Sequence, residues 1–343
     1  MVMASNRPDG PRYLYAILPN PEGGWIPDRL PDRIDDEVYL IKGERFAAVV
    51  RDAATSSFIQ RDRQELARLL LRHQQVIERV MAWTSVLPVK FGTVAPDGQA
   101  VARSLANGAA AFADAFERMK GKTQCEILVT WDPKPVFAAI AAEPEVVQLK
   151  RELTTDSRAV DPVAAARLGA LVKRIFDRRR YELAEGIAQV LRHSAEDAVH
   201  NALMDDRMVL NIALLIDDDR AADLDDCLDT LDVSYEGKLT FRCIGPLPPH
   251  SFATVEVSFL DADKIAWARR LLELDAVQDT TALQAAYRRL AKQAHPDIAA
   301  SGSGERIAEL KDAFTTLSSY VDAGGPVVVA VSRTEAASAA VGG

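Results

Sequence analysis

Side chains that could perform acid–base or metal chemistry are few and scattered in this sequence of 343 residues. Three consecutive carboxylates, Asp217 to Asp219, could hold Mg²⁺, but no phosphate-binding loop and no further acidic cluster accompanies them. Capping of the helix expected over residues 220–230 is the simpler interpretation, because carboxylates are favourable at a helix N-terminus. His73 lies on the apolar stripe of another predicted helix, where a core or boundary histidine is the simpler interpretation.

No catalytic constellation emerges from the remaining residues. There is no nucleophile motif, phosphate loop or dinucleotide fingerprint. The three cysteines, Cys125, Cys227 and Cys243, show no Cys-x-x-Cys spacing, so neither a zinc site nor a disulfide framework is expected. We therefore predict no enzymatic activity, no catalytic residue, no metal and no cofactor.

Composition restricts the partners and the compartment. The formal net charge of −9 argues against general nucleic-acid binding, which needs a basic surface. The dense basic run at Arg174 and residues 178–180 has Asp177 and Glu182 as neighbours, which favours an ion-paired, solvated helix face. No signal-peptide pattern and no apolar run of membrane-spanning length is present, which indicates a cytoplasmic protein without a membrane partner.

The most distinctive local pattern is a basic amphipathic helix that stops at a His-Pro-Asp tripeptide. Its apolar positions, spaced four, three and four residues apart, are Leu283, Tyr287, Leu290 and Ala294. Pro296 disfavours helical geometry at His295, so the helix should end there. A loop rich in Gly, Ala and Ser and a second apolar run, Ile307, Leu310, Phe314, Leu317 and Val321, follow. The two helices should pack antiparallel with the tripeptide at the tip of the hairpin.

This segment resembles helix II and the loop of a J-domain, the module that binds Hsp70 chaperones and stimulates their ATPase. The resemblance implies these Hsp70-interaction candidates: Arg288, Arg289, Lys292, His295, Pro296 and Asp297. The sequence departs from the J-domain pattern at Arg269, Glu273 and Ile298. The alternative is a two-helix appendage in which the tripeptide occurs by chance.

The rest of the chain alternates between strand and helix patterns. Strands are expected at residues 13–18, 125–131, 208–216, 239–244 and 254–259, and a hairpin with its turn at 42–45. Helices are expected at 61–84, with the stripe Leu66, Leu69, Leu70, Ile77, Val80 and Met81, and at 99–119 and 163–200. This order predicts an α+β fold with two mixed domains, the second ferredoxin-like, followed by a helical J-domain-like hairpin.

The expected domain boundaries follow from these elements. Residues 1–12 should be a disordered N-terminus, 13–120 an N-terminal α+β domain, and 121–260 the ferredoxin-like domain. Residues 261–323 should form the J-domain-like module. The low-complexity residues 324–343 should be a flexible tail.

Two further motifs remain. Residues 86–94 read Val-Leu-Pro-Val-Lys-Phe-Gly-Thr-Val, and residues 245–252 read Gly-Pro-Leu-Pro-Pro-His-Ser-Phe. With the strand beginning at Tyr13, they resemble the gas vesicle protein F/L family over roughly residues 12–260. The family-motif positions are Pro88, Lys90, Phe91, Gly92, Gly245, Pro246, Pro248, Pro249 and Phe252. The family usually has Arg at the position of Lys90 and an aromatic pair at those of Leu247 and His250.

The resemblance implies a gas vesicle assembly factor or minor component that binds the apolar shell protein and limits its aggregation during nucleation. Implied partners are the shell protein, other gas vesicle accessory proteins and Hsp70, in the cytoplasm at gas vesicles. The alternative is a structural component of the mature shell with a vestigial J-like module. For the motifs themselves, physical reasoning offers a rigid inter-strand crossover at 245–252, because proline fixes φ and removes donors. Lys90 and Phe91 are either a partner contact or, for Phe91, buried between domains.

Overall fold

A computed structural model describes residues 10–20, 37–53, 62–155, 162–275, 279–294 and 303–334. The chain forms two compact units, and the first combines Met1–Lys120 with Ala253–Ser332. The second combines Gly121–Phe252 with Arg333–Gly343. The expected boundary at 260 is therefore displaced, because the last expected strand belongs to the first unit. Within the expected disordered N-terminus, Arg12 is buried and begins a strand, whereas residues 1–9 lie outside the described residues.

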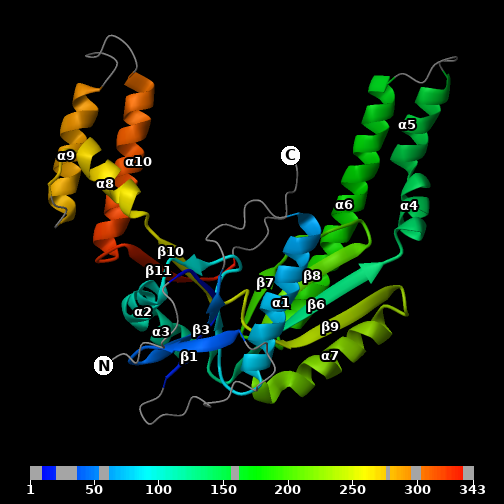
Figure 1. The fold of residues 1–343 in the computed structure, drawn as a ribbon. Coiled ribbons are helices and arrows are strands. Elements are labelled where there is room, and N and C mark those ends of the chain that lie inside the picture. The colour runs from blue at the N-terminus through cyan, green and yellow to red at the C-terminus, as the bar shows by residue number, and fades with distance from the viewer. Residues whose placement is uncertain are drawn as a thin grey trace. The chain divides into compact units, whose positions relative to one another are not determined.

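The first unit is built on an antiparallel sheet in the order β2-β3-β1-β4, with β5 also paired to β1 (Figure 1). The strands are β1 (Arg12–Pro19), β2 (Val38–Lys42), β3 (Phe46–Asp52), β4 (Leu87–Pro88) and β5 (Val94–Ala95). The predicted hairpin is present, since β2 and β3 pair from Val38 opposite Arg51 to Lys42 opposite Ala47. Strand β1 is buried on both faces, so its side chains feed two separate apolar clusters.

Helices cover the two faces of this sheet. Helix α1 (Arg63–Met81) packs into the cluster that contains Tyr13 and Tyr15, whereas α2 (Gly98–Asn107) and α3 (Ala109–Met119) pack into the cluster that contains Leu14 and Ile17. The predicted stripe of α1 is buried only in its second half, at His73, Val76, Ile77 and Val80. Its first half is different, because Leu66 and Leu70 are exposed.

Two strands distant in sequence close the first unit. Strand β10 (Thr254–Phe259) pairs antiparallel with β11 (Val327–Ser332) along their full lengths. The prediction of a flexible tail from 324 is wrong over this segment, because its β-branched valines suit a pleated, half-buried strand and Val327 enters the core. The Asn107 side-chain amide holds this entry by donating to the carbonyls of Ala323 (3.2 Å) and Val327 (3.1 Å).

Three helices are inserted between β10 and β11. They are α8 (Ala262–Leu271), α9 (Thr280–Gln293) and α10 (Ser303–Asp322). Helices α9 and α10 occupy the two predicted helical segments, and α10 packs against both α8 and α9 (Figure 1). Their shared core contains Leu283, Leu290, Leu310 and Leu317. The helices are thus fastened at both ends, since the amide of Leu260 donates to the carbonyl of Pro326 (2.8 Å).

The second unit has one antiparallel sheet in the order β7-β8-β6-β9. Its strands are β6 (Lys122–Trp131), β7 (Asp197–His200), β8 (Met208–Asp217) and β9 (Leu239–Leu247). Its helices are α4 (Pro133–Ala141), α5 (Pro144–Thr155), α6 (Pro162–Arg192) and α7 (Ala221–Ser234), with the short helix η1 (Asp218–Arg220) before α7. In Figure 1, α4 and α5 lie along α6.

The long helix predicted over 163–200 is too long by eight residues. It ends at Arg192, and residues Asp197–His200 instead pair with β8. The alternation around buried Val199 fits a strand, and only pairing with the strongly apolar β8 fixes it. No helix among the described residues is long and apolar enough to cross a membrane.

Candidate functional site: two motif segments and a basic helix

The first motif segment, residues 86–94, crosses between two sheets of the first unit. Leu87 and Pro88 pair with Ile17 and Ala16 of β1. The chain then turns to β10, where the amide of Lys90 donates to the carbonyl of Val255 at 2.9 Å. Gly92 follows with a φ of +87°, a left-handed conformation that favours glycine. The residues of this motif therefore fix the path of the backbone between β1 and β10.

His73 of α1 braces this path from beneath. Its Nε2 lies 3.1 Å from the carbonyl oxygen of Val89, which can only accept, so Nε2 carries the proton. Its Nδ1 then accepts the hydroxyl of Tyr13 at 2.7 Å. The ring also stacks on Tyr15, with centroids 5.5 Å apart. Both nitrogens of a neutral His73 are thus satisfied in a buried site, which agrees with the predicted core histidine.

Burial acts on the hydroxyl partner as well. Desolvation is the main cause that raises the pKa of Tyr13 well above its usual range, so the phenol stays protonated and donates. Phe91 closes the cluster edge-on to His73, with centroids 5.5 Å apart. Phe91 therefore packs against the aromatic and aliphatic cluster of the first unit.

Lys90 is the solvent-facing member of the first motif segment. Its ammonium lies 2.9 Å from Oε2 of Glu256 on β10, and the hydroxyl of Ser332 on β11 donates to Oε1 at 2.8 Å. The hydrogen bond from Lys90 is the main cause that lowers the pKa of Glu256. The side chain of Lys90 is 62% exposed, so a cation is presented here on an anchored backbone.

The second motif segment, residues 245–252, leaves the edge strand β9 and leads to β10, which belongs to a different sheet. The Gly245–Pro246 bond is cis. The backbone amide of Ser251 donates a hydrogen bond to the side-chain oxygen of buried Gln124 on β6, at 2.9 Å. Phe252 is 5% exposed, and its amide donates to the carbonyl of Pro249. These contacts agree with the rigid crossover expected from the prolines.

The positions within the second segment differ in exposure. Gly245 and Pro246 are exposed, Pro248 is buried and Pro249 is half-buried. Burial lowers the pKa of His250 to about 4, so that imidazole is neutral at pH 7. This half-buried, neutral histidine stands where the family usually has an aromatic residue.

The basic helix α9 presents its predicted cations to solvent. Arg288, Arg289 and Lys292 are all exposed. Arg289 lies 2.8 Å from Glu273, one of the residues that depart from the J-domain pattern. Helix α9 ends at Gln293, as expected. His295, Pro296 and Asp297 lie outside the described residues.

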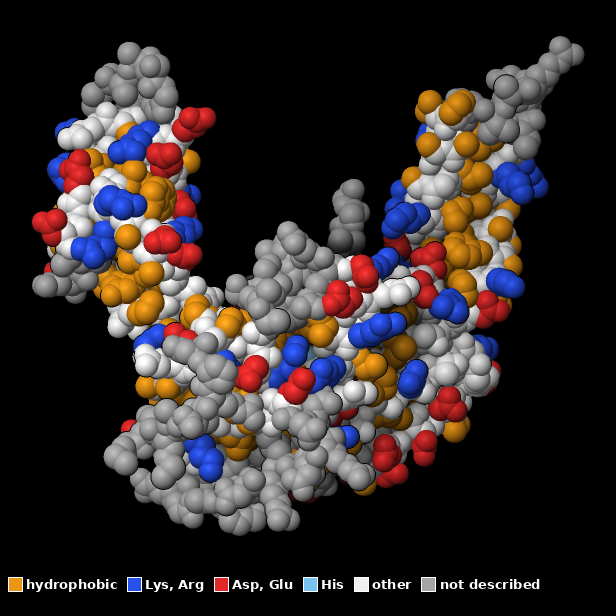
Figure 2. Space-filling view, viewed as in Figure 1, with side chains coloured by type: hydrophobic (Ala, Val, Ile, Leu, Met, Phe, Trp, Pro, Cys, Tyr) orange, Lys and Arg blue, Asp and Glu red, His pale blue; other side chains and the backbone are white. Residues whose placement is uncertain are grey.

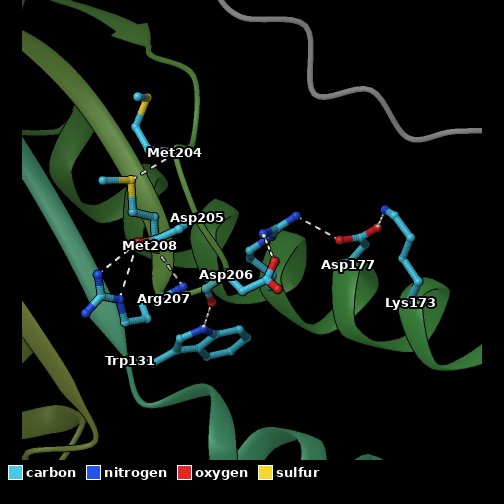
Figure 3. A network of polar contacts seen from close by, with 9 residues as sticks. Trp131, Lys173, Asp177, Met204, Asp205, Asp206, Arg207 and Met208 are labelled. Carbon is cyan, nitrogen blue, oxygen red and sulfur yellow. Dashed lines mark hydrogen bonds and ion pairs between the residues drawn. The ribbon is translucent and has the colours of Figure 1, made fainter. Parts of the chain in front are cut away.

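A polar network in the second unit was missed at the level of sequence (Figure 3). The indole of Trp131, at the end of β6, donates to the carbonyl of Asp206 at 2.8 Å. Arg180 of α6 bonds to Asp177 at 2.7 Å and lies 3.9 Å from Asp206. The network ties α6 to the loop before β8, and it confirms that the basic run is ion-paired in part. The only signal in the sequence was the run of three charged residues, Asp205, Asp206 and Arg207.

The described residues contain no group of three His, Cys, Asp or Glu side chains that could hold a metal. Fold and site together define a two-unit α+β protein whose motif residues hold a fixed backbone path. The model of the family described as gas vesicle synthesis protein GvpL/GvpF matches residues 11–254. The chain belongs to this family of gas vesicle proteins, which are not enzymes.

Individual relatives agree with this membership. The chain is 28% identical over 255 residues to gas vesicle protein L1 of Halobacterium salinarum, covering 71% of this chain and 90% of the relative. It is 24% identical over 247 residues to gas vesicle protein F of Microcystis aeruginosa, covering 70% and 97%. The matched residues end before α8, so the three-helix insertion lies beyond them.

Solved structures share the fold. The crystal structure of the gas vesicle protein GvpF from Microcystis aeruginosa gives a TM-score of 0.56 at 23% identity, covering 70% of this chain and 98% of that chain. That of GvpF from Anabaena gives 0.55 at 19% identity, covering 71% and 95%.

Proposed function

We propose that this protein is a gas vesicle assembly factor that binds the apolar shell protein and limits its aggregation during nucleation. Membership of the GvpL/GvpF family supports a role in gas vesicle formation. The observation that carries the finer proposal is the leucine ridge of α1, which comprises the exposed Leu66, Leu70 and Leu71 and the half-buried Leu69. Its members Leu66, Leu70 and Leu71 are 39%, 52% and 60% exposed.

The ridge continues the buried stripe of the same helix. Leu66, Leu70, His73 and Ile77 recur every three or four residues, so they lie along one face. The stripe is buried from His73 onward, where α1 covers β1, and its leucines are uncovered before that point. Single exposed leucines need no explanation, but adjacent ones form a patch that suits an apolar partner.

Another group of exposed apolar side chains lies on the helices α4 to α6. Phe137 and Val163 are 39% and 68% exposed there. In Figure 2 the hydrophobic side chains of these helices are interspersed with Lys and Arg. We favour α1 for a very apolar client because three of its leucines, Leu69, Leu70 and Leu71, are consecutive in the sequence.

Aggregation of purified shell protein, followed by light scattering without Hsp70, tests the proposal. We expect the full chain to suppress scattering and the variant Leu66→Ser/Leu70→Ser/Leu71→Ser to lose most of that effect. The matched control is Met204→Ser/Val233→Ser, which removes side chains that are 79% and 77% exposed in the second unit. Equal suppression by the ridge variant would refute the ridge. Failure of the unaltered chain would refute client protection and favour a structural component of the shell.

We also infer that the three-helix insertion recruits Hsp70 as a J-domain does. The packed core of α8, α9 and α10 and the exposed Arg288 and Lys292 support this inference. Cations on a rigid helix suit an acidic partner surface. His295→Gln should leave the thermal unfolding curve unchanged and abolish stimulation of Hsp70 ATPase. Unchanged stimulation in that variant would make the tripeptide a chance occurrence.

The fold interpretation that accompanies these proposals is a ferredoxin-like second unit. Its element order is strand, helices, strand, strand, helix, strand, and its all-antiparallel order β7-β8-β6-β9 supports that topology.

A further inference from the structure

Two cysteines of the second unit lie on neighbouring strands and on the same face. Cys243 of β9 lies directly opposite Ile127 of β6. Cys125 precedes Ile127 by two residues, and side chains two apart in a strand share a face. Cys125 and Cys243 are therefore diagonal neighbours across the β6–β9 ladder.

The ladder is irregular beside them. Glu126 faces Ile244 and Gln124 faces Leu247, so β9 carries one extra residue opposite Cys125. An ideal Cβ on Gly245 would lie only 2.6 Å from Sγ of Cys125. The sulfur of Cys125 thus rests against the bulged backbone that begins the second motif segment, where only glycine leaves room.

The two thiols are chemically unequal. Cys243 is exposed on the edge strand β9, while Cys125 is half-buried. The interaction between the two thiols is the main cause that lowers the pKa of Cys243 to about 7 and raises the pKa of Cys125. Asp225 of α7 faces both sulfurs and opposes ionisation of each. Near neutral pH the accessible sulfur is substantially thiolate, and the sheltered one keeps its proton.

We propose that Cys243 and Cys125 form a hydroperoxide-reactive pair, in which Cys243 is the attacking thiol and Cys125 the resolving thiol. This inference is independent of the proposed function. The Cys243 thiolate attacks the terminal oxygen of the hydroperoxide, so that an S–O bond forms, the O–O bond breaks and an alcohol or water leaves after protonation. Sulfur of Cys125 then attacks the sulfenic acid, so that an S–S bond forms and water leaves with the Cys125 proton. Two electrons pass from the two thiols to the hydroperoxide.

The position of β9 makes the second step feasible. A disulfide needs sulfurs about 2 Å apart, so the two strands must move until this diagonal pair reaches that distance. Strand β9 stands at the end of the sheet order and is bulged at this point, so its backbone can shift without breaking pairing on a second side. The bond would fasten β9 to β6 two residues before the second motif segment begins.

The third cysteine supplies a matched control. Cys227 of α7 is half-buried and packs against the core that Cys125 also touches. If simple accessibility to oxidant decided the outcome, Cys227 would compete with Cys125 for the sulfenic acid. The proposal requires that it does not.

The test treats the full-length reduced protein with hydrogen peroxide and, separately, tert-butyl hydroperoxide at neutral pH. We expect the titratable thiols to fall from three to one, a mass loss of two hydrogen atoms, and a peptide joining Cys125 to Cys243. Cys227→Ser should form the same bond, and Cys125→Ser should instead accumulate a Cys243 sulfenic acid that dimedone traps. Cys243→Ser should react at least tenfold more slowly.

Three outcomes would overturn the proposal. They are retention of all three thiols by folded, unaltered protein, a disulfide that includes Cys227, and equal reaction rates for Cys243→Ser and the unaltered chain. Circular dichroism of each variant before treatment keeps a misfolded variant from being counted among them.

Discussion

The first and second motif segments both carry the resemblance to the family, yet they are held by different means. Residues 86–94 are paired to β1 and β10 and braced by the buried ring of His73. Residues 245–252 connect strands of two different sheets, and the buried side chain of Gln124 accepts a hydrogen bond from the amide of Ser251. The difference teaches that a sequence signature can mark a rigid path rather than a binding surface. Exposed features outside the motifs then become the places to look for partners.

Removing the brace of the first segment should have the largest effect. His73→Ala deletes a buried ring together with the acceptor of the Tyr13 hydroxyl and the donor to the Val89 carbonyl, which should cost about 3–4 kcal/mol of unfolding free energy. Denaturant titration measures the loss. His193→Ala is the control, since His193 is exposed and should change stability by under about 0.5 kcal/mol. Equal losses in the two variants would mean that the cluster does not hold the segment.

The brace also shows how far sequence could reach. The apolar stripe placed His73 in the core, because a helix period of 3.6 residues identifies the buried face. It could not find Tyr13 and Val89 as partners, since those contacts span 60 and 16 residues and depend on strand pairing. Strand β11 was missed for the same reason, because its partner β10 lies beyond the inserted helices.

Sequence reasoning also erred where a pattern ran on past its support. The apolar stripe of α1 is continuous from Leu66 to Val80, yet it is buried only from His73 onward. Periodicity identifies the apolar face of a helix, but it does not say which part of that face another element covers. For the same reason, the predicted helix ran past Arg192 into residues that instead pair with β8. Of the candidate site residues, the exposed Arg288, Arg289 and Lys292 were the easiest to predict, since a basic helix face needs no tertiary partner.

Loosening the anchor of the second segment should have an intermediate effect. Gln124→Leu keeps the side chain close to its size but leaves the buried amide of Ser251 without its acceptor, which should cost about 1–3 kcal/mol. Hydrogen exchange at Ser251, measured by NMR, should accelerate with it. Gln148→Leu, on the exposed face of α5, is the control. If exchange at Ser251 stays as slow as in the unaltered chain, the crossover is held by its prolines alone.

The smallest effect is expected for the surface pair of the first segment. Lys90→Ala removes the cation beside Glu256, and both side chains are substantially exposed, at 62% and 41%. Exposed pairs contribute about 0–1 kcal/mol, so the loss at pH 7 should stay under about 1 kcal/mol.

Because Lys90 lowers the pKa of Glu256, its contribution exists above the unfolded pKa of that carboxyl, near 4.5, and disappears as the pH falls through the folded pKa. The stability difference between Lys90→Ala and the unaltered chain should therefore be present at pH 7 and vanish at strongly acidic pH. A difference that persists after Glu256 is protonated would mean that the stem of Lys90 stabilises the turn by packing. The first segment would then be held by side-chain contacts on its outer face as well as by His73 within.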